Sequence, residues 1–564
     1  MRVWKFLLVG LLLPAHTTWG ASPEAVRGIH GVVASRSIIA SEVGLDIMRS
    51  GGNAIDAVVA TGFALAVTYP SAGNLGGGGF LVIRLTDGTV ITNDNRERAP
   101  TKAHRDMYLD ENGEVVRGLS VASHLAVGVP GTVDGLLAVL ERYGTKSRKQ
   151  VLAPAIGLAR DGFSLPLDLA RQFARLRERL ARYPVSLAKF TPSDGGSYQP
   201  GDIWQQPDLA RTLERIARAG RDGFYKGKTA ELIVAEMKRG GGLISMEDLA
   251  NYRSRWREPV RGSYRGYEIV SMPPPSSGGV LLVHMLNMLE PYDVAAMGYG
   301  SASLMHHMVE AARRAYADRA EHLGDPDFYE VPMAMLLSKR YAEQRWADFS
   351  HEHASDSEAI GAGSWGEEST QTTHVSVMDA AGNAVAYTTT LNLGYGSKIV
   401  AEGTGVLLNN EMDDFSVKPN TPNSFQLLGG VANEIQPGKR MLSSMTPTIV
   451  LKDGQPVLVT GSPGGSTIIT TVLQVVMNVV DHGMGLSNAV GKPRFHHQWK
   501  PNRITVEKFG FSPDTLAILR KLGHKEISSR RFGRGIGDAN SVMRLGEDLY
   551  GMSDPRNNGG AAAF

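Results

Sequence analysis

Thr372 is the residue of this sequence with the clearest potential for chemistry. It begins TTHVSVMDAAGNAVAYTTTLN, residues 372–392, which has the pattern of two β-strands joined by a turn. A threonine hydroxyl is a weak nucleophile, but a threonine at the start of a chain carries its own base, an α-amine with an ordinary pKa of about 8. A cut before Thr372 would make it both nucleophile and base. Without a cut, two threonines at a strand start indicate only β-structure.

The stretch before Thr372 is a place where such a cut is sterically possible. Residues 350–371, SHEHASDSEAIGAGSWGEESTQ, are rich in Ser, Glu, Gly and Ala and lack apolar periodicity, which predicts an exposed loop. The hydroxyl of Thr372 could attack the carbonyl carbon of Gln371, and water would hydrolyse the resulting ester. The junction Gln371–Thr372 is therefore a candidate self-cleavage site.

Helices and hairpins on both sides of this junction must position the reacting groups. Residues 40–70 predict two helices, and 466–483 predict a buried helix directly after Gly464-Gly465. Asp-Gly pairs between apolar runs predict hairpins at residues 87–88 and 453–454. Strand pairs that alternate with buried helices in both halves of the chain predict layered sheets covered by helices.

Composition and charge narrow the classes of protein. The chain has 564 residues, of which 42% are hydrophobic and 21% charged, as in globular proteins with a large core. The formal net charge of +2 falls to zero without the two cations of the first twenty residues, so nothing indicates nucleic acid or an anionic membrane as a partner. The absence of cysteine excludes disulfides, thiolate metal sites and a cysteine nucleophile.

The N-terminus has the pattern of a secretory signal peptide. Arg2 and Lys5 precede an apolar run, 6–15, that is too short to span a bilayer comfortably, and small residues follow. We expect residues 1–20 to be the signal peptide, cut after Gly20 or Ala21. The mature protein is then expected to be periplasmic or secreted, without a membrane anchor; a retained signal anchor is the alternative.

Other patterns do not support a different chemistry. Gly227-Lys228-Thr229 lacks the upstream glycine of a phosphate-binding loop. The adjacent pairs His306-His307 and His496-His497 do not have the spacing of metal ligands on a helix, so we interpret them as structural histidines. No G-x-S-x-G elbow of an α/β-hydrolase is present.

Long blocks of the sequence are similar to one enzyme family. They include GGNAIDAVVA, ARRAYADRAEHLGDPDF, TTHVSVMDAAGNAVAYTTTLN, NNEMDDFS, LSSMTPTIV, GSPGGSTIITTVLQ, PRFHHQW and YGMSDPR. Over nearly the whole mature chain, the sequence resembles the γ-glutamyltransferases, which are N-terminal-nucleophile hydrolases. The resemblance implies a four-layer αββα sandwich made of two chains cut from one precursor, a large subunit, 21–371, and a small catalytic subunit, 372–564, which stay together as a heterodimer.

The resemblance also implies a set of site residues, which the needs of a γ-glutamyl substrate explain. Thr372 is the nucleophile and Thr390 a second threonine that contacts it. The donors for a substrate carboxylate are Arg96, Ser443 and Ser444. The acceptors for the substrate ammonium group are Asn392, Glu411 and Asp414. The glycines of the oxyanion hole are Gly464 and Gly465.

The lid is a point of variation within the family. Residues 419–430, PNTPNSFQLLGG, match the loop that covers the glutamate site in many members, and Phe425 stands where an aromatic gate residue, often tyrosine, is common. Phenylalanine keeps the stacking surface but lacks the hydroxyl. Glu411 stands where some bacterial members have glutamine, and its negative charge should favour binding of the substrate ammonium group.

The function that this resemblance implies is an exported γ-glutamyltransferase. Thr372 would cleave the γ-glutamyl amide of glutathione or related compounds and pass the γ-glutamyl group to water, an amino acid or a dipeptide, with no metal or organic cofactor. The alternatives are an acylase of the same superfamily that acts on glutaryl or cephalosporin side chains, and a catalytically dead relative that serves as a binding protein.

Overall fold

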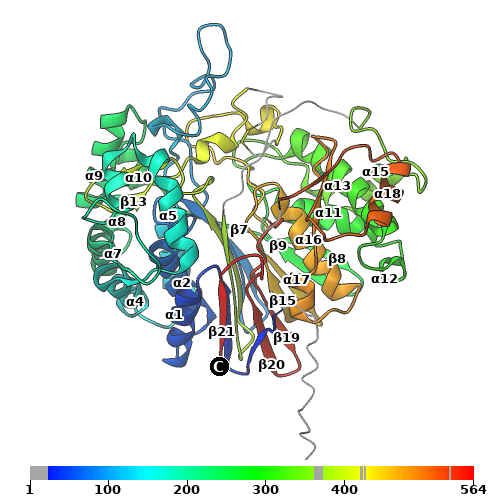
Figure 1. Ribbon diagram of the computed structural model, residues 1–564, viewed down its shortest axis with the longest axis horizontal. Helices are drawn as coiled ribbons and strands as arrows, with labels where there is room; N and C mark the ends of the chain where they lie inside the picture. The colour runs from blue at the N-terminus through cyan, green and yellow to red at the C-terminus, as the bar shows by residue number, and fades with distance from the viewer. Residues whose placement is uncertain (1–22, 361–371, 419–422, 425–426, 532–534) are drawn as a thin grey trace, which may run out of the picture.

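The computed structural model describes residues 23–360, 372–418, 423–424, 427–531 and 535–564. Two seven-stranded sheets lie face to face between two layers of helices (Figure 1). The expected αββα sandwich is confirmed. The expected signal peptide, Gln371 and Phe425 lie outside the described residues.

Both large sheets contain strands from before and after residue 372. In their order across the first sheet, the strands are β1 (Val26–Gly28), β20 (Asp548–Met552), β19 (Ser541–Leu545), β15 (Gln455–Thr460), β14 (Thr448–Lys452), β9 (Tyr267–Ser271) and β8 (Val260–Tyr264). Across the second sheet they are β21 (Gly560–Ala563), β2 (Gly31–Ser35), β10 (Thr373–Asp379), β11 (Ala384–Thr390), β3 (Gly78–Arg84), β4 (Val90–Asp94) and β7 (Arg255–Arg257). A cut before Thr372 would therefore leave two interleaved chains.

The helices form a layer on the outer face of each sheet, as Figure 1 shows. On the side of the second sheet, blue to green in the figure, they are α1 (Ile38–Arg49), α2 (Ala54–Thr68), α3 (Thr132–Tyr143), α4 (Arg148–Asp161), α5 (Leu167–Leu180), α6 (Pro184–Lys189), α7 (Pro207–Ala219), α8 (Asp222–Tyr225), α9 (Gly227–Gly240) and α10 (Met246–Asn251). On the other side they are α11 (Gly278–Leu289), α12 (Val294–Met297), α13 (Ala302–His322), α14 (Met333–Leu336), α15 (Lys339–Trp346), α16 (Thr467–Val480), α17 (Leu486–Gly491) and α18 (Pro513–Lys521).

Short elements complete the chain away from the two large sheets. Among the described residues, the small sheets are formed by β5 (Phe163–Ser164) with β6 (Ile203–Trp204), by β12 (Val400–Ala401) with β13 (Val406–Leu407), and by β16 (Phe495–His496), β17 (Ile504–Val506) and β18 (Ile527–Ser529). Single 3-10 turns lie at His124–Ala126, Glu411–Asp414 and Val431–Asn433.

The alternation of side chains along the central strands explains the layered core. In β2, Val33 packs under the helices of its own layer, whereas Val32 and Ala34 point to the space between the sheets. Because successive residues of a strand face opposite sides, one fully buried strand serves both cores. Polar groups between the sheets are also satisfied: the Ser376 hydroxyl in β10 hydrogen-bonds the carbonyl oxygens of Val459 and Asn540 across the layer.

The local predictions on either side of the site are confirmed. The helix α1 ends at Arg49, before Gly51 and Gly52, and Asn53 caps α2 with a capping box. The two Asp-Gly turns join β3 to β4 and β14 to β15. The hairpin of β10 and β11 runs in antiparallel register with Thr373 opposite Thr389, so Thr372 lies immediately before the first strand at the centre of its sheet.

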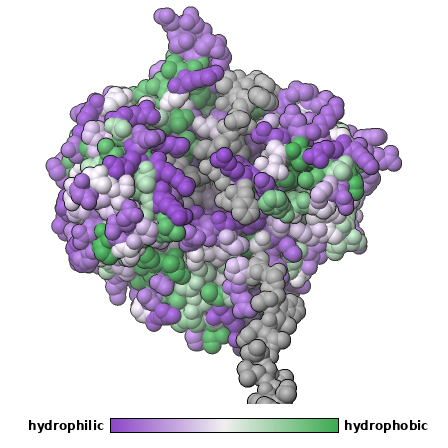
Figure 2. Space-filling view, viewed as in Figure 1, coloured by the Kyte–Doolittle hydropathy of each residue, from purple (hydrophilic) through white to green (hydrophobic). Residues whose placement is uncertain are grey.

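Two surface findings concern the molecule as a whole. The face in Figure 2 is mostly hydrophilic, with hydrophobic residues scattered among charged ones. Among the described residues, no helix is long and apolar enough to cross a membrane.

Candidate active site

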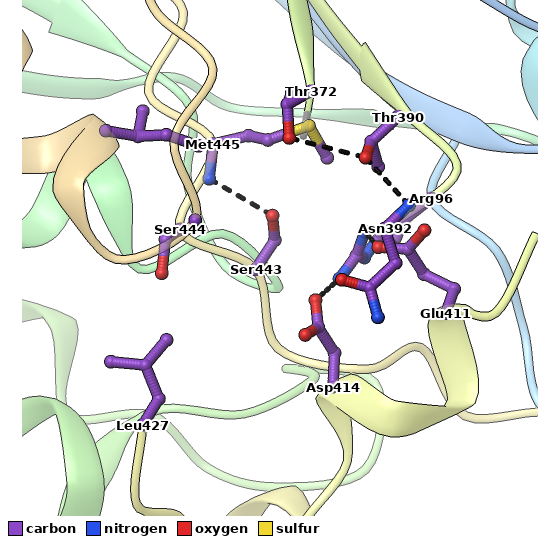
Figure 3. A pocket seen from close by; sticks show the side chains of 12 residues that line it. Arg96, Thr372, Thr390, Asn392, Glu411, Asp414, Leu427, Ser443, Ser444 and Met445 are labelled. Atoms are coloured by element: carbon purple, nitrogen blue, oxygen red, sulfur yellow. Dashed lines mark hydrogen bonds and ion pairs between the residues drawn. The ribbon is translucent and has the colours of Figure 1, made fainter. Parts of the chain in front are cut away.

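Thr372 lies at the wall of a cavity that brings together residues from distant parts of the chain. We call this the first cavity; its described lining residues are Arg96, Thr372, Thr390, Asn392, Glu411, Asp414, Leu427, Ser443, Ser444, Met445, Gly465 and Ile468. Nearly all of the residues singled out in the sequence are thus placed together (Figure 3). Gly464 lies next to Gly465 but lines the opposite side of Thr372.

The hydroxyl of Thr372 is buried and oriented by a second threonine. Its Oγ1 donates a hydrogen bond of 3.3 Å to Oγ1 of Thr390, the last residue of β11. The backbone N–H of Asn392 donates to the same Thr390 oxygen at 2.8 Å. Asn392 has a φ of 72°, a conformation that is costly for a residue with a side chain and that is found at functional sites. The turn after β11 therefore places Thr390 and Asn392 beside Thr372, the candidate nucleophile.

Gly464 and Gly465 form a backbone turn suited to an oxyanion. Their φ angles are 137° and 55°, which favour glycine, and the helix α16 begins two residues later. Neither backbone N–H donates a hydrogen bond to any described residue. Two available N–H groups ahead of a helix N-terminus can stabilise the negative charge of a tetrahedral intermediate formed at Thr372.

A single guanidinium organises the far end of the first cavity. Arg96, which follows β4, is fully buried and forms ion pairs with Glu411 and Asp414. Its Nε donates to the carbonyl oxygen of Met441 at 3.2 Å, and Nη2 donates to that of Leu442 at 3.3 Å. Arg96 is therefore held between two segments that lie more than three hundred positions further along the chain.

The acids around Arg96 outnumber it. Glu97 lies 3.7 Å from the Arg96 guanidinium and is buried beside Glu411 and Asp414. Burial raises the pKa of Asp414 to about 6 and that of Glu97 to about 7, and it raises the pKa of Glu411 well above its usual range. Three carboxyl groups share one guanidinium, so protons remain on part of the group near neutral pH, and a ligand cation beside them would favour the ionised forms.

Four acceptor oxygens of this group have no hydrogen-bond donor. Within the described part of the chain, Oδ1 of Asn392, Oε2 of Glu411 and both carboxyl oxygens of Glu97 are buried without a hydrogen bond. Buried acceptors are almost always paired in folded proteins, and an unpaired one costs free energy. A ligand ammonium group would supply both the missing donors and the missing positive charge.

Ser443 and Ser444 line the opposite wall. Oγ of Ser443 accepts a hydrogen bond of 3.1 Å from the backbone N–H of Met445, and the hydroxyl proton stays available for a ligand. Oγ of Ser444 accepts a 3.4 Å hydrogen bond from Nη2 of Arg319. In Figure 3 the Ser443 side chain faces the Arg96 and Asp414 side chains across the cavity. A carboxylate between them could accept from both serines.

Comparison with known proteins now identifies the family. Residues 40–564 match the sequence profile of the gamma-glutamyltranspeptidase family. The chain belongs to this family. It is 51% identical over 535 residues to a glutathione hydrolase proenzyme of Escherichia coli (strain K12), with 94% of this chain and 91% of the relative covered. It is 47% identical over 548 residues to a glutathione hydrolase proenzyme of Pseudomonas sp. (strain A14), with 96% and 95% covered.

A solved structure shares the whole architecture of this gamma-glutamyltranspeptidase family member. The crystal structure of cephalosporin acylase from Bacillus halodurans superposes with a TM-score of 0.85 at 27% sequence identity, covering 98% of this chain and 99% of the other. Proteins with a γ-glutamyl name and proteins with an acylase name thus share one scaffold, so the scaffold alone does not distinguish their substrates.

Two charged residues beside this site, Glu97 and Arg319, were not predicted from the sequence of this gamma-glutamyltranspeptidase family member. Glu97 is adjacent to Arg96, but nothing in its local pattern indicates burial. Arg319, on α13, is buried, donates to Ser277 and Ser444, and has a pKa lowered to about 10 by burial. Arg319 is part of the block ARRAYADRAEHLGD, where the cluster of charges on a helix reads as a solvated face. Only its packing shows that it supports the serine wall.

The described part of the expected lid contacts the acids of the first cavity. Nδ2 of Asn423 donates to Asp414 at 3.3 Å, and the backbone N–H of Ser424 donates to Asp413 at 3.1 Å. Leu427 lines the cavity itself. Because Phe425 lies outside the described residues, its role as gate remains a prediction.

His306 and His307 lie in an environment that was not predicted from the sequence. His306, Glu310 and His524 bring their ligand atoms within 4.8 Å of one another, so a carboxylate does lie beside His306. However, both oxygens of Glu310 are engaged by Arg313 and Arg314, and His306 hydrogen-bonds His524 and the carbonyl oxygen of Ser350. This arrangement is that of a buried hydrogen-bonded network.

Proposed function

We propose that this protein is an exported γ-glutamyltransferase that acts on glutathione and related γ-glutamyl compounds. The observation that carries the proposal is the position of Thr372 between two complementary features. On one side lies a cavity with a surplus of buried carboxyl groups and unpaired acceptors, and next to it lies a turn with two available N–H groups. A γ-glutamyl group has the ammonium, carboxylate and scissile carbonyl that these features require.

The first step in this proposal is self-cleavage. Oγ1 of Thr372 attacks the carbonyl carbon of Gln371, the C–N bond breaks, and an ester to Oγ1 forms. Water hydrolyses the ester to leave a carboxylate at Gln371, a free hydroxyl and a free α-amine on Thr372. Residues 1–20 are removed as a signal peptide, so the mature enzyme consists of chains 21–371 and 372–564. The interleaving of strands in both sheets supports a heterodimer that stays associated.

In the Michaelis complex, the two charged groups of the donor bind to different walls of the first cavity. The α-carboxylate accepts hydrogen bonds from Arg96, Ser443 and Ser444. The α-ammonium group donates to Asn392, Glu411 and Asp414, and its charge favours the ionised form of both carboxyl groups. Fixing both groups leaves the γ-carbonyl carbon near Thr372.

The chemical steps use Thr372 as base and nucleophile. Its neutral α-amine accepts the hydroxyl proton while Oγ1 attacks the γ-carbonyl carbon, and the N–H groups of Gly464 and Gly465 stabilise the oxyanion. The amine of the leaving group takes the proton as the C–N bond breaks, which leaves a γ-glutamyl ester on Oγ1. Attack by water gives glutamate, and attack by an amino acid or dipeptide amine gives a new γ-glutamyl amide. Thr390 holds the Thr372 hydroxyl in place through the hydrogen bond described above.

An acylase of the same scaffold is the alternative, because the cephalosporin acylase superposes on this chain. A glutaryl group has no α-ammonium, so binding it would leave the carboxyl groups of Glu411 and Asp414 without a compensating cation. Rates of p-nitroaniline release from γ-glutamyl- and glutaryl-p-nitroanilide decide between the two. We expect a strong preference for the γ-glutamyl compound; equal rates, or a preference for the glutaryl compound, would favour the acylase.

The location of the protein follows from the proposed signal peptide. We propose that the mature protein is periplasmic or secreted. Cell fractionation with intact-mass analysis tests this, since the mature large chain should begin at residue 21 or 22. Recovery of the uncut N-terminus in the membrane fraction would indicate a signal anchor instead.

A further inference from the structure

A second cavity lies on the other side of Thr372. Its lining includes Thr372, Gly464, Tyr69, Arg36 and Asp538, and among the described residues it shares only Thr372 with the first cavity. If the γ-glutamyl group fills the first cavity, as the proposed function requires, the amine on the far side of the scissile bond must lie in the second. The cavity is therefore where a leaving group departs and an acceptor enters.

The walls of the second cavity offer hydrogen-bond donors. Arg36 pairs through Nε with the Asp538 carboxylate at 2.9 Å and lies over the Tyr69 ring, 5.3 Å from its centroid. Its Nη1 is buried and has no hydrogen-bond partner in the described part of the chain. An unpaired guanidinium N–H in a buried wall is costly unless a ligand accepts from it. Asp538 and Tyr69 hold the guanidinium in place, and its Nη1 stays unpaired in the wall of the cavity.

The neighbouring residues show that the missing hydrogen-bond partner is not common to every arginine in this wall. Arg556 lines the same cavity, but Glu507, Asp554 and the carbonyl oxygens of Val490 and Lys492 engage its guanidinium. Arg556 is therefore part of the wall. Nδ2 of Asn557, next in sequence, is buried without a hydrogen-bond partner of normal geometry among the described residues. The unpaired donors thus cluster at Arg36 and Asn557.

The second cavity continues into a groove that carries a surplus of positive charge. The groove shares Arg36, Arg556 and Asn557 with the cavity, and α5 adds Arg171, Arg175 and Asp168 to its lining. Four arginines against one acid among these lining residues favour an anionic group that approaches from solvent. Dipeptides and amino acids carry their carboxylate beyond the amine that reacts.

We propose that the second cavity is the subsite for the leaving dipeptide and the incoming acceptor, and that Arg36, assisted by Asn557, binds their free carboxylate. The acceptor amine attacks the γ-glutamyl ester, a C–N bond forms, the C–Oγ1 bond to Thr372 breaks, and the amine proton returns to Oγ1 through the Thr372 α-amine. Arg36 acts by holding the acceptor in position for this attack. The proposal rests on the proposed function and adds the residues that bind the carboxylate of the acceptor.

The test compares two acceptors that differ only in the carboxylate. Transfer from γ-glutamyl-p-nitroanilide is measured with glycylglycine and with glycylglycinamide, which keeps the attacking amine. We expect kcat/KM of the wild-type protein to favour the acid by about tenfold or more, because a charge-assisted hydrogen bond is lost with the amide. Release of p-nitroaniline without acceptor reports the proposed function separately, so its absence would overturn that function and not only the subsite.

Variants then assign the discrimination to Arg36. Arg36→Lys keeps the positive charge for Asp538 but loses the forked donor, so the ratio of acid to amide should fall to within about threefold of one. Arg265→Lys is the matched control: Arg265 also pairs with a buried aspartate, Asp481, beside the ring of Tyr264, but lies outside both cavities. It should keep the wild-type ratio.

Three results would overturn the subsite. They are a wild-type protein that uses both acceptors equally, an Arg36→Lys protein that keeps the wild-type ratio, and a control that loses it together with Arg36→Lys. Denaturing electrophoresis of each variant shows whether it has been cut. If Arg36→Lys is not cut, Asn557→Ala provides the second variant, and its ratio should also fall below that of the wild type.

Discussion

The first and second cavities share Thr372 but balance their charges in opposite ways. In the first, three buried carboxyl groups surround Arg96, and the unpaired atoms are acceptors. In the second, Arg36 has one carboxylate partner, and the unpaired atoms are donors. A donor with an ammonium group and an acceptor with a carboxylate therefore each find the opposite charge. The comparison indicates that one nucleophile can select two different substrates when the cavities on its two sides offer opposite hydrogen-bonding groups.

Removal of the residue that both cavities share should have the largest effect. Thr372→Ala should remain one uncut chain and lose activity by about 10⁴-fold or more, because nucleophile and base are lost together. Denaturing intact mass and p-nitroaniline release measure the two consequences. Thr372→Ser keeps a hydroxyl and should still be cut. A cut or active alanine variant would contradict the mechanism.

Substitutions in the turn between the two cavities should have the second-largest effect. Gly464→Ala or Gly465→Ala should lower kcat by about 10²–10³-fold, the loss expected when an oxyanion donor is displaced. Both glycines have positive φ angles, and a Cβ at Gly464 would lie 2.3 Å from Oγ1 of Thr467. Steady-state kinetics should show a smaller change in the donor KM than in kcat.

A control for this prediction is available in a distant hairpin. Gly454 also has a positive φ, 75°, in the turn between β14 and β15, and a Cβ added there would meet no atom within 4 Å. Gly454→Ala should lower the free energy of unfolding by on the order of 1 kcal/mol and leave kcat unchanged. If it lowered kcat as much as Gly465→Ala, backbone strain and not the oxyanion would explain the loss.

A change in one acid should affect the first cavity alone. Glu411→Gln keeps the shape of the side chain but cannot ionise beside the bound ammonium group, so KM for γ-glutamyl-p-nitroanilide should rise by about tenfold. The glutaryl compound, which has no ammonium group, should lose nothing. Glu434→Gln is the control, since Glu434 pairs with Arg105 outside the cavity. If the ratio of the KM values for the two donors were unchanged in Glu411→Gln, Glu411 would not take part in binding the ammonium group.

The pH dependence of donor binding should give the smallest effect. The pKa of Asp414 is raised to about 6 by burial, so this carboxyl is ionised above that pH and protonated below it. As the pH falls from 7 to 5, the attraction for the donor ammonium is lost, and KM should rise by several-fold, at most about tenfold per unit. The glutaryl compound should show a flat KM in this range. If KM for the γ-glutamyl donor did not change over this pH range, Asp414 would not be a binding residue for the donor ammonium group.

The sequence predicted much of the framework because the signals are local. The Asp-Gly turns, the Asn53 cap and the period-2 pattern of the central hairpin each depend on residues within a few positions of one another. The resemblance also identified Arg96, Asn392, Glu411, Asp414, Ser443, Ser444, Gly464 and Gly465 as candidates, and all of them lie at or beside the first cavity with Thr372.

Other features depended on contacts between distant segments. Glu97 and Arg319 have ordinary surroundings in the sequence, and only packing makes them buried charges beside the site. The pairing of Arg36 with Asp538 joins the two ends of the chain, and no local pattern predicts it. The carboxylate beside His306 was likewise missed, because His524 and the arginines around Glu310 come together only in the fold.

The sequence by itself determined which residue could become the nucleophile, which turns and helices flank it, and which family the chain resembles, because these depend on residue type and short-range spacing. Tertiary structure decided the charge balance on each side of Thr372. Burial shifts the pKa values of Glu97, Glu411 and Asp414, and leaves Nη1 of Arg36 without a partner, only when segments hundreds of residues apart exclude water from the same space. In the proposed function, that balance assigns a donor to one side of Thr372 and an acceptor to the other.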